Sequence, residues 1–433
     1  MSYKTYGEYR ESGVDWISSI PSNWNIIRLK FLTDIVTGST PSKIDDTYYK
    51  DGTFPWVKPD DLNGLTPITK TNVSINDKGK KISRIIPKDS VLVCCIGSLG
   101  KIGVAGTELA TNQQINSLIP NKLLNNDFCK YMVIASNSEY AKYSNSNVVA
   151  IINKQQQGEL KYPIPPLKEQ KQIANYLNKK TTKIDSTIDK SEELVKLLEE
   201  KRIALINQVV TKGLNSDVAM KDSGIEWIGE IPEHWNIDKI KKYFRIYNGS
   251  TPKDKEENWF GDICWVTPAD YKTNDVYIND SARQITKIGL NSCGTTLVPK
   301  GSIIVSNRAP IGSVAIANVD LCTNQGCKSL VRKKDINSKF VYYILSVNEK
   351  ELNKLGRGTT FMELSSYDLG TFKIPIASSS EQNDIVSFLD KEISKINKTS
   401  SKIKENITLL KEYKTSLIHH VVTGKIDVRD EEI

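Results

Sequence analysis

The chain has 433 residues, of which 39% are hydrophobic and 25% charged, with a net charge of +8 at pH 7. This composition is typical of a globular protein and excludes a wholly disordered, collagen-like or low-complexity chain. At roughly 150 residues per domain, the length predicts two to four domains. No run approaches the roughly 18 apolar residues of a spanning helix, and residues 1–13 are polar where a signal peptide would be apolar, so we expect a cytoplasmic protein.

A long unit occurs twice in the chain. Ser12-Gly13-Val14-Asp15-Trp16-Ile17 returns 211 residues later as Ser223-Gly224-Ile225-Glu226-Trp227-Ile228. Further matches follow in the same order: Gly38-Ser39-Thr40-Pro41 with Gly249-Ser250-Thr251-Pro252, Trp56-Val57 with Trp265-Val266, Thr111-Asn112-Gln113 with Thr323-Asn324-Gln325, and Glu169-Gln170 with Glu381-Gln382. Such a duplication predicts pseudo-twofold architecture.

The amino-acid composition changes once within each copy. The first part of the copy is rich in Gly, Pro, Asn and short β-branched runs, which predicts short strands joined by long loops. After Ile164-Pro165-Pro166 and Ile374-Pro375 the sequence turns to Lys, Glu, Leu and Ile, which predicts a long helix. The fold class is therefore α+β. The segments in chain order are a leader at 1–20, a globular domain at 21–166, a helix at 167–212, a linker at 213–231, a second globular domain at 232–378, a second helix at 379–424 and an acidic tail at 425–433.

Both helices carry apolar residues at heptad spacing with the same phase. A seam that recurs every 3.5 residues predicts a coiled coil in which the two helices pack on each other. The alternative is that each helix covers only the core of its own domain. The expected seam residues are Leu177, Ile184, Ile188, Val195, Leu198 and Leu205 in the first helix, and Leu389, Ile396, Ile403, Ile407, Leu410 and Leu417 in the second.

The positive charge is concentrated in the two globular domains, each of which has a net charge of +5. A basic excess of this kind favours a polyanion such as DNA, because neutralised phosphates release counterions. Two basic domains held apart by a helical rod of roughly 50 Å would contact two sites on one face of a duplex whose turn is roughly 34 Å. The target would then be split around an unread gap.

No catalytic motif is visible. Gly97-Ser98-Leu99-Gly100-Lys101-Ile102 lacks the Ser or Thr of a phosphate loop, and Gly356-Arg357-Gly358 lacks the third glycine of a dinucleotide site. Pro59-Asp60 with Glu159-Leu160-Lys161 resembles a nuclease set, but the second copy does not reproduce it. Seven cysteines without a Cys-x-x-Cys pair and three histidines provide little material for a metal site. We therefore expect no catalytic residue, no metal and no cofactor bound by this chain.

Taken together, these motifs resemble the specificity subunit of type I restriction-modification systems over essentially the whole chain. The resemblance rests on the repeated order of globular domain and helix, on the Gly-Ser-Thr-Pro and Thr-Asn-Gln motifs, and on the Glu-Gln pairs that open both helices. Two longer segments also carry it: Ser223-Gly224-Ile225-Glu226-Trp227-Ile228-Gly229-Glu230-Ile231-Pro232-Glu233-His234-Trp235 and Arg308-Ala309-Pro310-Ile311-Gly312.

The resemblance implies that each globular part is a target-recognition domain that reads one half of a bipartite, asymmetric DNA sequence. It further implies that the helices form an antiparallel coiled coil that sets the gap and docks two methyltransferase (modification) subunits. The chain itself would be non-catalytic. S-adenosylmethionine, ATP and Mg would be used by the partners in a DNA adenine methyltransferase and ATP-dependent endonuclease complex, to which restriction (translocase) subunits are added.

Residues that read bases are expected where the two copies differ, because identical residues cannot distinguish two half-sites. The copies differ at Cys95-Ile96-Gly97-Ser98-Leu99-Gly100 against Asn307-Arg308-Ala309-Pro310-Ile311-Gly312, and at Ala150-Ile151-Ile152 against Thr360-Phe361-Met362. Arg and Lys suit guanine edges, and Asn and Gln suit adenine. The candidates are Lys43, Tyr48, Lys80, Lys81, Arg84, Asn153, Lys154, Gln155 and Gln156 in the first domain, and Lys253, Lys272, Arg283, Gln284, Asn307, Arg308, Arg357 and Thr359 in the second.

A second function remains open at the level of sequence. The chain could be a stand-alone DNA-binding or scaffolding protein whose helical rod dimerises with another copy. Both functions use the basic domains, but only the first requires methyltransferase partners.

Overall fold

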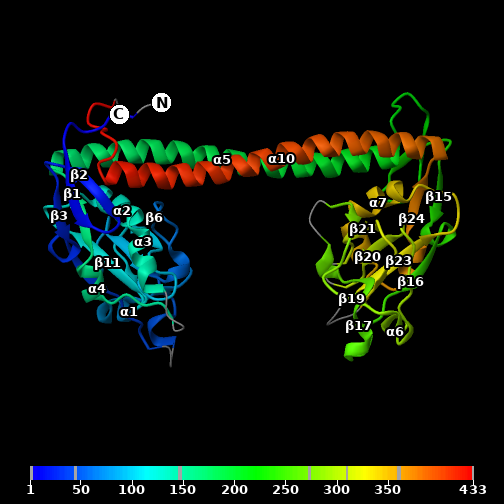
Figure 1. Ribbon diagram of the computed structural model, residues 1–433, viewed down its shortest axis with the longest axis horizontal. Helices are drawn as coiled ribbons and strands as arrows, with labels where there is room; N and C mark the ends of the chain where they lie inside the picture. The colour runs from blue at the N-terminus through cyan, green and yellow to red at the C-terminus, as the bar shows by residue number, and fades with distance from the viewer. Residues whose placement is uncertain are drawn as a thin grey trace. The chain divides into compact units, whose positions relative to one another are not determined.

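The computed structural model describes residues 3–42, 46–144, 149–271, 275–308, 311–357 and 362–431. The chain divides into unit 1, which comprises Met1–Ser191 and Glu405–Ile433, and unit 2, which comprises Glu192–Lys404. In each unit a strand-rich globular part lies on one side of two helix segments (Figure 1). The predicted α+β fold with two tandem globular domains is confirmed.

The globular part of unit 1 contains a large and a small sheet. The large sheet consists, in spatial order, of β4 (Thr33–Thr37), β11 (Ile115–Pro120), β8 (Val91–Cys94), β9 (Ile102–Ala105) and β6 (Pro67–Ile68). The small sheet consists of β10 (Ala110–Thr111), β5 (Phe54–Val57) and β7 (Ser74–Ile75). Strand pairs join β1 (Tyr9–Val14) to β2 (Ile17–Pro21) and β12 (Lys161–Ile164) to β3 (Asn25–Arg28). The short helices are α1 (Asp77–Ile82), α2 (Asn126–Ala135), α3 (Asn137–Ala141) and α4 (Lys154–Gly158).

Unit 2 repeats this order of strands. Its large sheet consists of β16 (Phe244–Asn248), β23 (Cys327–Arg332), β20 (Ile303–Ser306), β21 (Val314–Ala317) and β18 (Tyr277–Ile278). Its small sheet consists of β19 (Gln284–Ile285), β17 (Trp259–Val266) and β22 (Leu321–Thr323). Strand pairs join β13 (Met220–Asp222) to β14 (Glu230–Pro232) and β15 (Asn236–Lys239) to β24 (Lys373–Ile376). The short helices are α6 (Lys287–Asn291), α7 (Ser338–Ser346), α8 (Glu349–Lys354) and α9 (Ser366–Thr371).

Two glycines shared by the copies show why identical residues belong to the scaffold. A Cβ atom on Gly38 would lie 2.2 Å from the carbonyl oxygen of Thr111, and a Cβ atom on Gly249 would lie 1.8 Å from that of Asn324. Real Cβ atoms do not approach oxygen so closely. The close approach of two backbone segments therefore requires glycine at this point in both domains.

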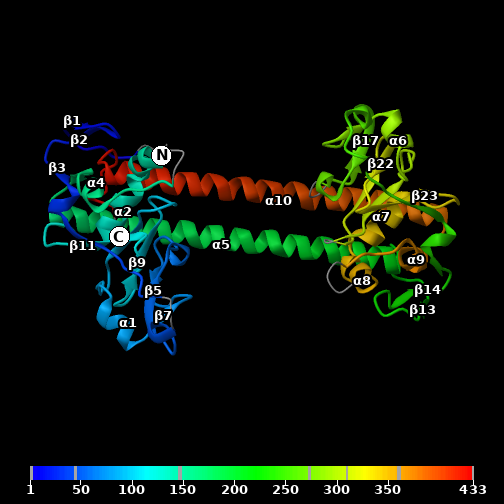
Figure 2. The ribbon, with the colours of Figure 1, turned by 90° about the horizontal axis from the view of Figure 1, so that it is seen from below.

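The two long helices are α5 (Leu167–Lys212) and α10 (Ser379–Val422). Unit 1 holds the N-terminal part of α5 with the C-terminal part of α10, and unit 2 holds the other two parts, so the helices run antiparallel (Figure 2). In unit 1 the Lys414 ammonium lies 2.6 Å from the Asp185 carboxylate. The expected seam residues are buried or half-buried: Leu177, Ile184, Ile188, Val195, Leu198, Leu205, Leu389, Ile396, Ile403, Ile407, Leu410 and Leu417.

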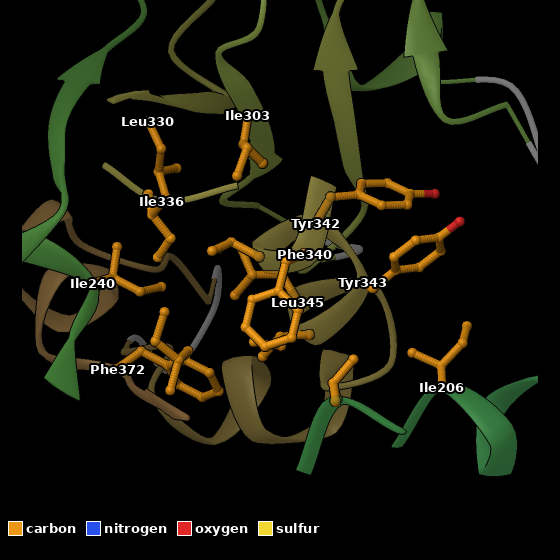
Figure 3. Packing of buried hydrophobic residues seen from close by; sticks show 14 of the residues in the cluster. Ile206, Ile240, Ile303, Leu330, Ile336, Phe340, Tyr342, Tyr343, Leu345 and Phe372 are labelled. Carbon is orange, nitrogen blue, oxygen red and sulfur yellow. The ribbon is translucent and has the colours of Figure 1, made fainter. Parts of the chain in front are cut away.

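In unit 2 the hydrophobic core of the globular part includes residues of α5. Figure 3 shows α7 side chains, among them Phe340 and Leu345, packed between sheet residues such as Ile303 and the α5 residue Ile206. All four of these side chains are buried. Burial of a large apolar side chain stabilises the folded state by about 1.5–3 kcal/mol. The helix is thus part of the hydrophobic core of the domain as well as of the helix pair.

The leader and the tail meet in unit 1. The backbone amide of Asp427 donates to the Lys4 carbonyl oxygen at 2.8 Å, and Lys4 pairs with Asp430. The Asp427 carboxylate also accepts from Arg429 at 2.8 Å. Within the described ranges, no helix combines the length and the apolar character that crossing a membrane requires.

Candidate nucleic-acid interface

A basic surface in unit 1 is built on the small sheet and α1. Asn76 caps this helix, because its side chain accepts from the amides of Lys78 and Gly79. The half-buried Lys80 places its ammonium 4.3 Å from the centre of the Phe54 ring, and Lys81 beside it is exposed. A cation held over an aromatic ring gains about 0.5–1 kcal/mol at an exposed site, so the ring limits the motion of Lys80.

Two further candidates lie near this surface. The exposed Arg84 donates from Nη1 to the Thr37 carbonyl oxygen at 2.6 Å. Tyr48 is half-buried, and its carbonyl oxygen accepts from the amide of Asn76 at 2.9 Å. The structure therefore brings Tyr48 and Lys80 together around Asn76 and α1.

In unit 2 an arginine lies over tryptophan rings of the small-sheet strand β17. The exposed Arg283 guanidinium lies 3.6 Å from the centre of the Trp259 ring and 5.5 Å from that of Trp265. Gln284 follows it and donates to Asp280 at 3.0 Å. The side chain of Lys253 is exposed. A guanidinium that lies over an aromatic ring can still donate its N–H groups to a ligand.

The glutamine-rich candidates of the first domain form α4. Asn153 and Gln156 bond to each other's backbone amides in a capping box, at 2.8 and 2.9 Å. Their side chains therefore satisfy the helix N-terminus. Lys154 and Gln155 are exposed and remain open to solvent.

The other candidates of the second domain form a charged cluster. The Arg308 guanidinium lies 3.2 Å from the Glu363 carboxylate, which also accepts from Asn307 Nδ2 at 2.9 Å. Arg357 donates to Asp368 at 2.8 Å. Asn307 is fully buried, whereas both arginines are exposed. Asn307 therefore bonds to the Glu363 carboxylate from the interior of the domain, and the two arginines face solvent.

Three candidates, Lys43, Lys272 and Thr359, lie outside the described residues. Three charged residues beside the candidate arginines, Glu363, Lys328 and Asp368, were not expected from the sequence. Lys328 is buried, with its ammonium 3.8 Å from Glu363 and donating to Asn248 at 2.8 Å. Burial lowers the pKa of Lys328, although Glu363 opposes this effect.

The sequence comparison of the two copies was wrong by two residues near α4 and α9. It placed Ala150-Ile151-Ile152 opposite Thr360-Phe361-Met362. The backbone bridges pair Ile96 with Ile151 and Arg308 with Glu363, so Glu363 is the counterpart of Ile151. An alignment of the two copies that allowed for these two residues would have placed Arg308 opposite Ile96 and Glu363 opposite Ile151.

Most cysteine thiols of both units are buried. Burial raises the pKa of the Cys129 and Cys327 thiols to about 12, as it does for Cys95 and Cys322, so these thiols are protonated and unreactive at neutral pH. Across the residues described here, no three His, Cys, Asp or Glu side chains are grouped to hold a metal ion.

Residues 21–196 and 232–409 both match the model of the family described as the type I restriction modification DNA specificity domain. These two segments cover more than half of the chain. The chain belongs to this family. The two matches also coincide with the two copies of the internal repeat, so each copy carries one specificity domain.

Curated relatives agree with this assignment. The type I restriction enzyme MjaIX specificity subunit of Methanocaldococcus jannaschii is 37% identical over 188 residues, which cover 42% of this chain and 44% of that protein. The putative MjaX specificity subunit of that organism is 30% identical over 64% of this chain and 62% of its own length. The chain thus spans less than two thirds of these two relatives. The MjaVIII specificity subunit is 25% identical over 95% of both chains.

Solved structures show the same fold. A chain from the work described as "Structural basis underlying complex assembly and conformational transition of the type I R-M system" matches 94% of this chain and 99% of its own length, with a TM-score of 0.69 and 17% identity. The HsdS subunit from Thermoanaerobacter tengcongensis matches with a TM-score of 0.52 and 17% identity. At this identity the similarity concerns the fold alone.

Proposed function

We propose that this chain is the sequence-specificity subunit of a type I restriction-modification complex and recognises a bipartite, asymmetric DNA target. The target-recognition domains comprise residues 21–166 and 232–378, and each reads one half-site. The chain is non-catalytic, binds no cofactor and acts in the cytoplasm. Two methyltransferase subunits use S-adenosylmethionine, and restriction subunits use ATP and Mg.

One observation carries this proposal. The two domains share the order of their strands, their glycine contacts and their backbone bridges, yet the bridge bears two isoleucines in unit 1 and an Arg–Glu pair in unit 2. A common scaffold with chemically different exposed groups supports the recognition of two different half-sites. The basic side chains of α1 and Arg283 add contacts to phosphate that do not depend on sequence.

The long helices support the second role, which is to position the partners. Leu197 on α5 and Leu409 on α10 occupy the same place in the two copies, and their side chains are 52% and 54% exposed. An exposed leucine at equivalent places of a duplicated helix fits a partner that binds in two copies. We therefore assign Leu197 and Leu409 to the docking of the two methyltransferase subunits.

Methylation-resolved sequencing of genomic DNA tests the function. Cells that express the chain with its methyltransferase are compared with cells that lack only this chain. We expect one split motif to lose modification in the second cells. Exchange of residues 21–166 for the corresponding domain of a relative should then change one half of the motif and leave the other intact.

The opposite result is equally clear. If an active methyltransferase modifies the same motifs with and without the chain, the specificity function is wrong. A stand-alone DNA-binding or scaffolding protein would then become the better explanation.

A further inference from the structure

The turn that follows β8 in unit 1 and β20 in unit 2 contains the same isolated β-bridge. Ile96 pairs with Ile151 in unit 1, and Arg308 pairs with Glu363 in unit 2. In both units the residue after the bridge donates its amide to the carbonyl of the residue before the bridge, at 3.0 and 2.9 Å. The capped helices α4 and α9 begin directly afterwards. The backbone of the bridge is shared, and its side chains are the variable part.

In unit 2 two arginines lie beside Glu363: Arg308 contacts its carboxylate, and Arg357 pairs with its backbone. Glu363 accepts from Arg308 at 3.2 Å and from Asn307 at 2.9 Å. The backbone amide of Glu363 donates to the Arg357 carbonyl oxygen at 2.9 Å, and the Arg357 amide donates to the Glu363 carbonyl oxygen at 3.0 Å. Arg357 is fixed a second time through its guanidinium, which bonds to the buried Asp368. Both guanidinium groups are therefore held in place while they remain exposed.

The interior of this cluster does not maximise stability. Asn307 is fully buried, and its Oδ1 has no hydrogen-bond partner among the described residues. An unpaired buried acceptor costs about 1–3 kcal/mol. Lys328 is buried beside it with a lowered pKa. Apolar residues form the corresponding bridge in unit 1, so the bridge itself does not require an Arg–Glu pair.

The geometry of Arg308 suits the recognition of guanine. A guanidinium has five N–H donors. Arg308 directs Nε and Nη2 to Glu363, and its other N–H groups have no partner among the residues that the structure describes. A guanidinium can make two parallel bonds to O6 and N7 of guanine in the major groove. A carboxylate that fixes the plane of the guanidinium before binding reduces the entropy lost on binding.

In unit 1 the same place is apolar. The side chains of Ile151 and its neighbour Val149 are 50% and 60% exposed, and Ile96 is half-buried. Asn116 takes the position of Lys328, and it is satisfied by hydrogen bonds to Gln157 and Thr37. Apolar side chains discriminate bases by contact with the thymine methyl group.

We propose that this bridge determines specificity in both domains: Arg308, positioned by Glu363, reads a guanine in the half-site of the second domain, and Ile96 with Ile151 contacts a thymine methyl group in the half-site of the first. This inference rests on the proposed function, because it assumes that each domain reads one half-site. It assigns a base class to one position in each half.

The guanine assignment is tested with the assembled methyltransferase that contains the full chain, on duplexes carrying the motif. Each guanine of the second half-site is replaced in turn by 7-deazaguanine, which lacks N7. At one position we expect methylation by the unaltered complex to fall about tenfold. The Arg308→Gln complex should methylate the normal duplex more slowly and should not distinguish guanine from 7-deazaguanine at that position.

The role of Glu363 is tested by combination. Glu363→Gln should reduce the discrimination between guanine and 7-deazaguanine at the same position. Adding Glu363→Gln to Arg308→Gln should cause no further loss of discrimination, because the carboxylate acts through the arginine. A merely structural role would instead lower methylation equally for all bases. If Glu363→Gln does not fold, the 7-deazaguanine series on the unaltered complex still decides the guanine assignment.

The thymine assignment uses deoxyuridine, which lacks only the methyl group. At one position of the first half-site we expect methylation to fall about fourfold on replacement of thymine, as for the loss of one buried methyl group. An Ile151→Ala complex should be insensitive to this replacement. Arg308→Gln should remain as sensitive as the unaltered complex.

The inference is overturned if no 7-deazaguanine in the second half-site and no deoxyuridine in the first changes methylation, or if the variants keep the sensitivity of the unaltered complex. Failure of the proposed function has a different result, because methylation sequencing would then find no split motif that depends on the chain.

Discussion

The indole nitrogen of Trp235 donates to the carboxylate of Glu381 at 3.1 Å, which ties the start of the second domain to the first turn of α10. Trp24 and Glu169 make the same bond at 3.1 Å in unit 1. His234 lies 2.8 Å from the same Glu381 oxygen. A carboxylate in the first turn of a helix also interacts favourably with the helix dipole.

The contacts of Glu381 predict a pH dependence of stability. Burial raises the pKa of Glu381, but hydrogen bonds from His234, Ser378 and Trp235 outweigh this effect and lower it to about 2. Because the folded pKa lies below the ordinary value of 4.5, the stabilisation is present above pH 4.5 and is lost as the pH falls toward 2. Glu381→Gln should weaken the dependence of the melting temperature on pH in this window. The exposed Asp384→Asn on the same helix should not.

Phe260 predicts a gain in stability. It has a φ angle of +62° and is 89% exposed, and Asp51 takes the equivalent place in unit 1 with a φ angle of +56°. A left-handed conformation costs about 1–2 kcal/mol for most residues and less for Asp. Phe260→Asp should therefore raise the free energy of unfolding by about 1 kcal/mol, as measured by chemical denaturation. The reverse change, Asp51→Phe, should lower it; an unchanged midpoint in both variants would contradict the strain.

The close backbone approach at Gly249 predicts a loss of stability. Gly249→Ala places a methyl group against the Asn324 carbonyl oxygen, and such overpacking costs about 1–3 kcal/mol. Gly7→Ala is the matched control, because a Cβ atom on Gly7 would have no neighbour within 4 Å. Denaturation midpoints of the two variants measure the difference. Equal midpoints would show that the backbone relaxes at little cost.

The two exposed leucines predict the stoichiometry of the complex. Leu197→Asp or Leu409→Asp should each remove one methyltransferase copy from the purified complex, and the double variant should remove both, because a charge is costly in an apolar contact. Light scattering of the co-purified complex measures the mass. Lys196→Asp changes the charge beside Leu197 without removing an apolar group, so a similar loss in that variant would argue against the leucine contacts.

Lys81 and Arg308 should differ in how they affect DNA binding. Lys81 is exposed on α1, and we expect Lys81→Gln to weaken binding of the assembled complex to all sequences alike and to reduce the slope of log affinity against log salt by about 1. Arg308→Gln should instead relax one base position. Lys122→Gln, beside the start of α2, serves as the control for loss of a charge. If Lys81→Gln changes sequence preference, it reads a base.

Much of the architecture was accessible from sequence. The repeat, the position of the strand-rich parts, the two long helices and their antiparallel pairing follow from spacing and from the family resemblance. Periodicity carries this information because local hydrogen bonding and apolar alternation act over a few residues. The same reasoning singled out Arg308 and Arg357.

The surroundings of the expected base-reading side chains were accessible from sequence only in part. Sequence reasoning selected Asn153 and Gln156 as readers of bases, whereas their side chains cap α4. It selected Asn307 as well, which is buried. Glu363 and Lys328, which lie near Arg308 in the structure, were not expected there, because a carboxylate and a buried lysine carry no local pattern that marks them as neighbours of an arginine far away in the chain.

The sequence by itself determined that one domain and one helix are written twice, since matching residues recur in one order over two hundred positions. Only the tertiary structure decided which side chains share a surface. The pairing of Arg308 with Glu363 and of Ile96 with Ile151 depends on a bridge between segments 55 residues apart. Such contacts arise from the packing of the whole domain, and no short stretch of sequence contains them.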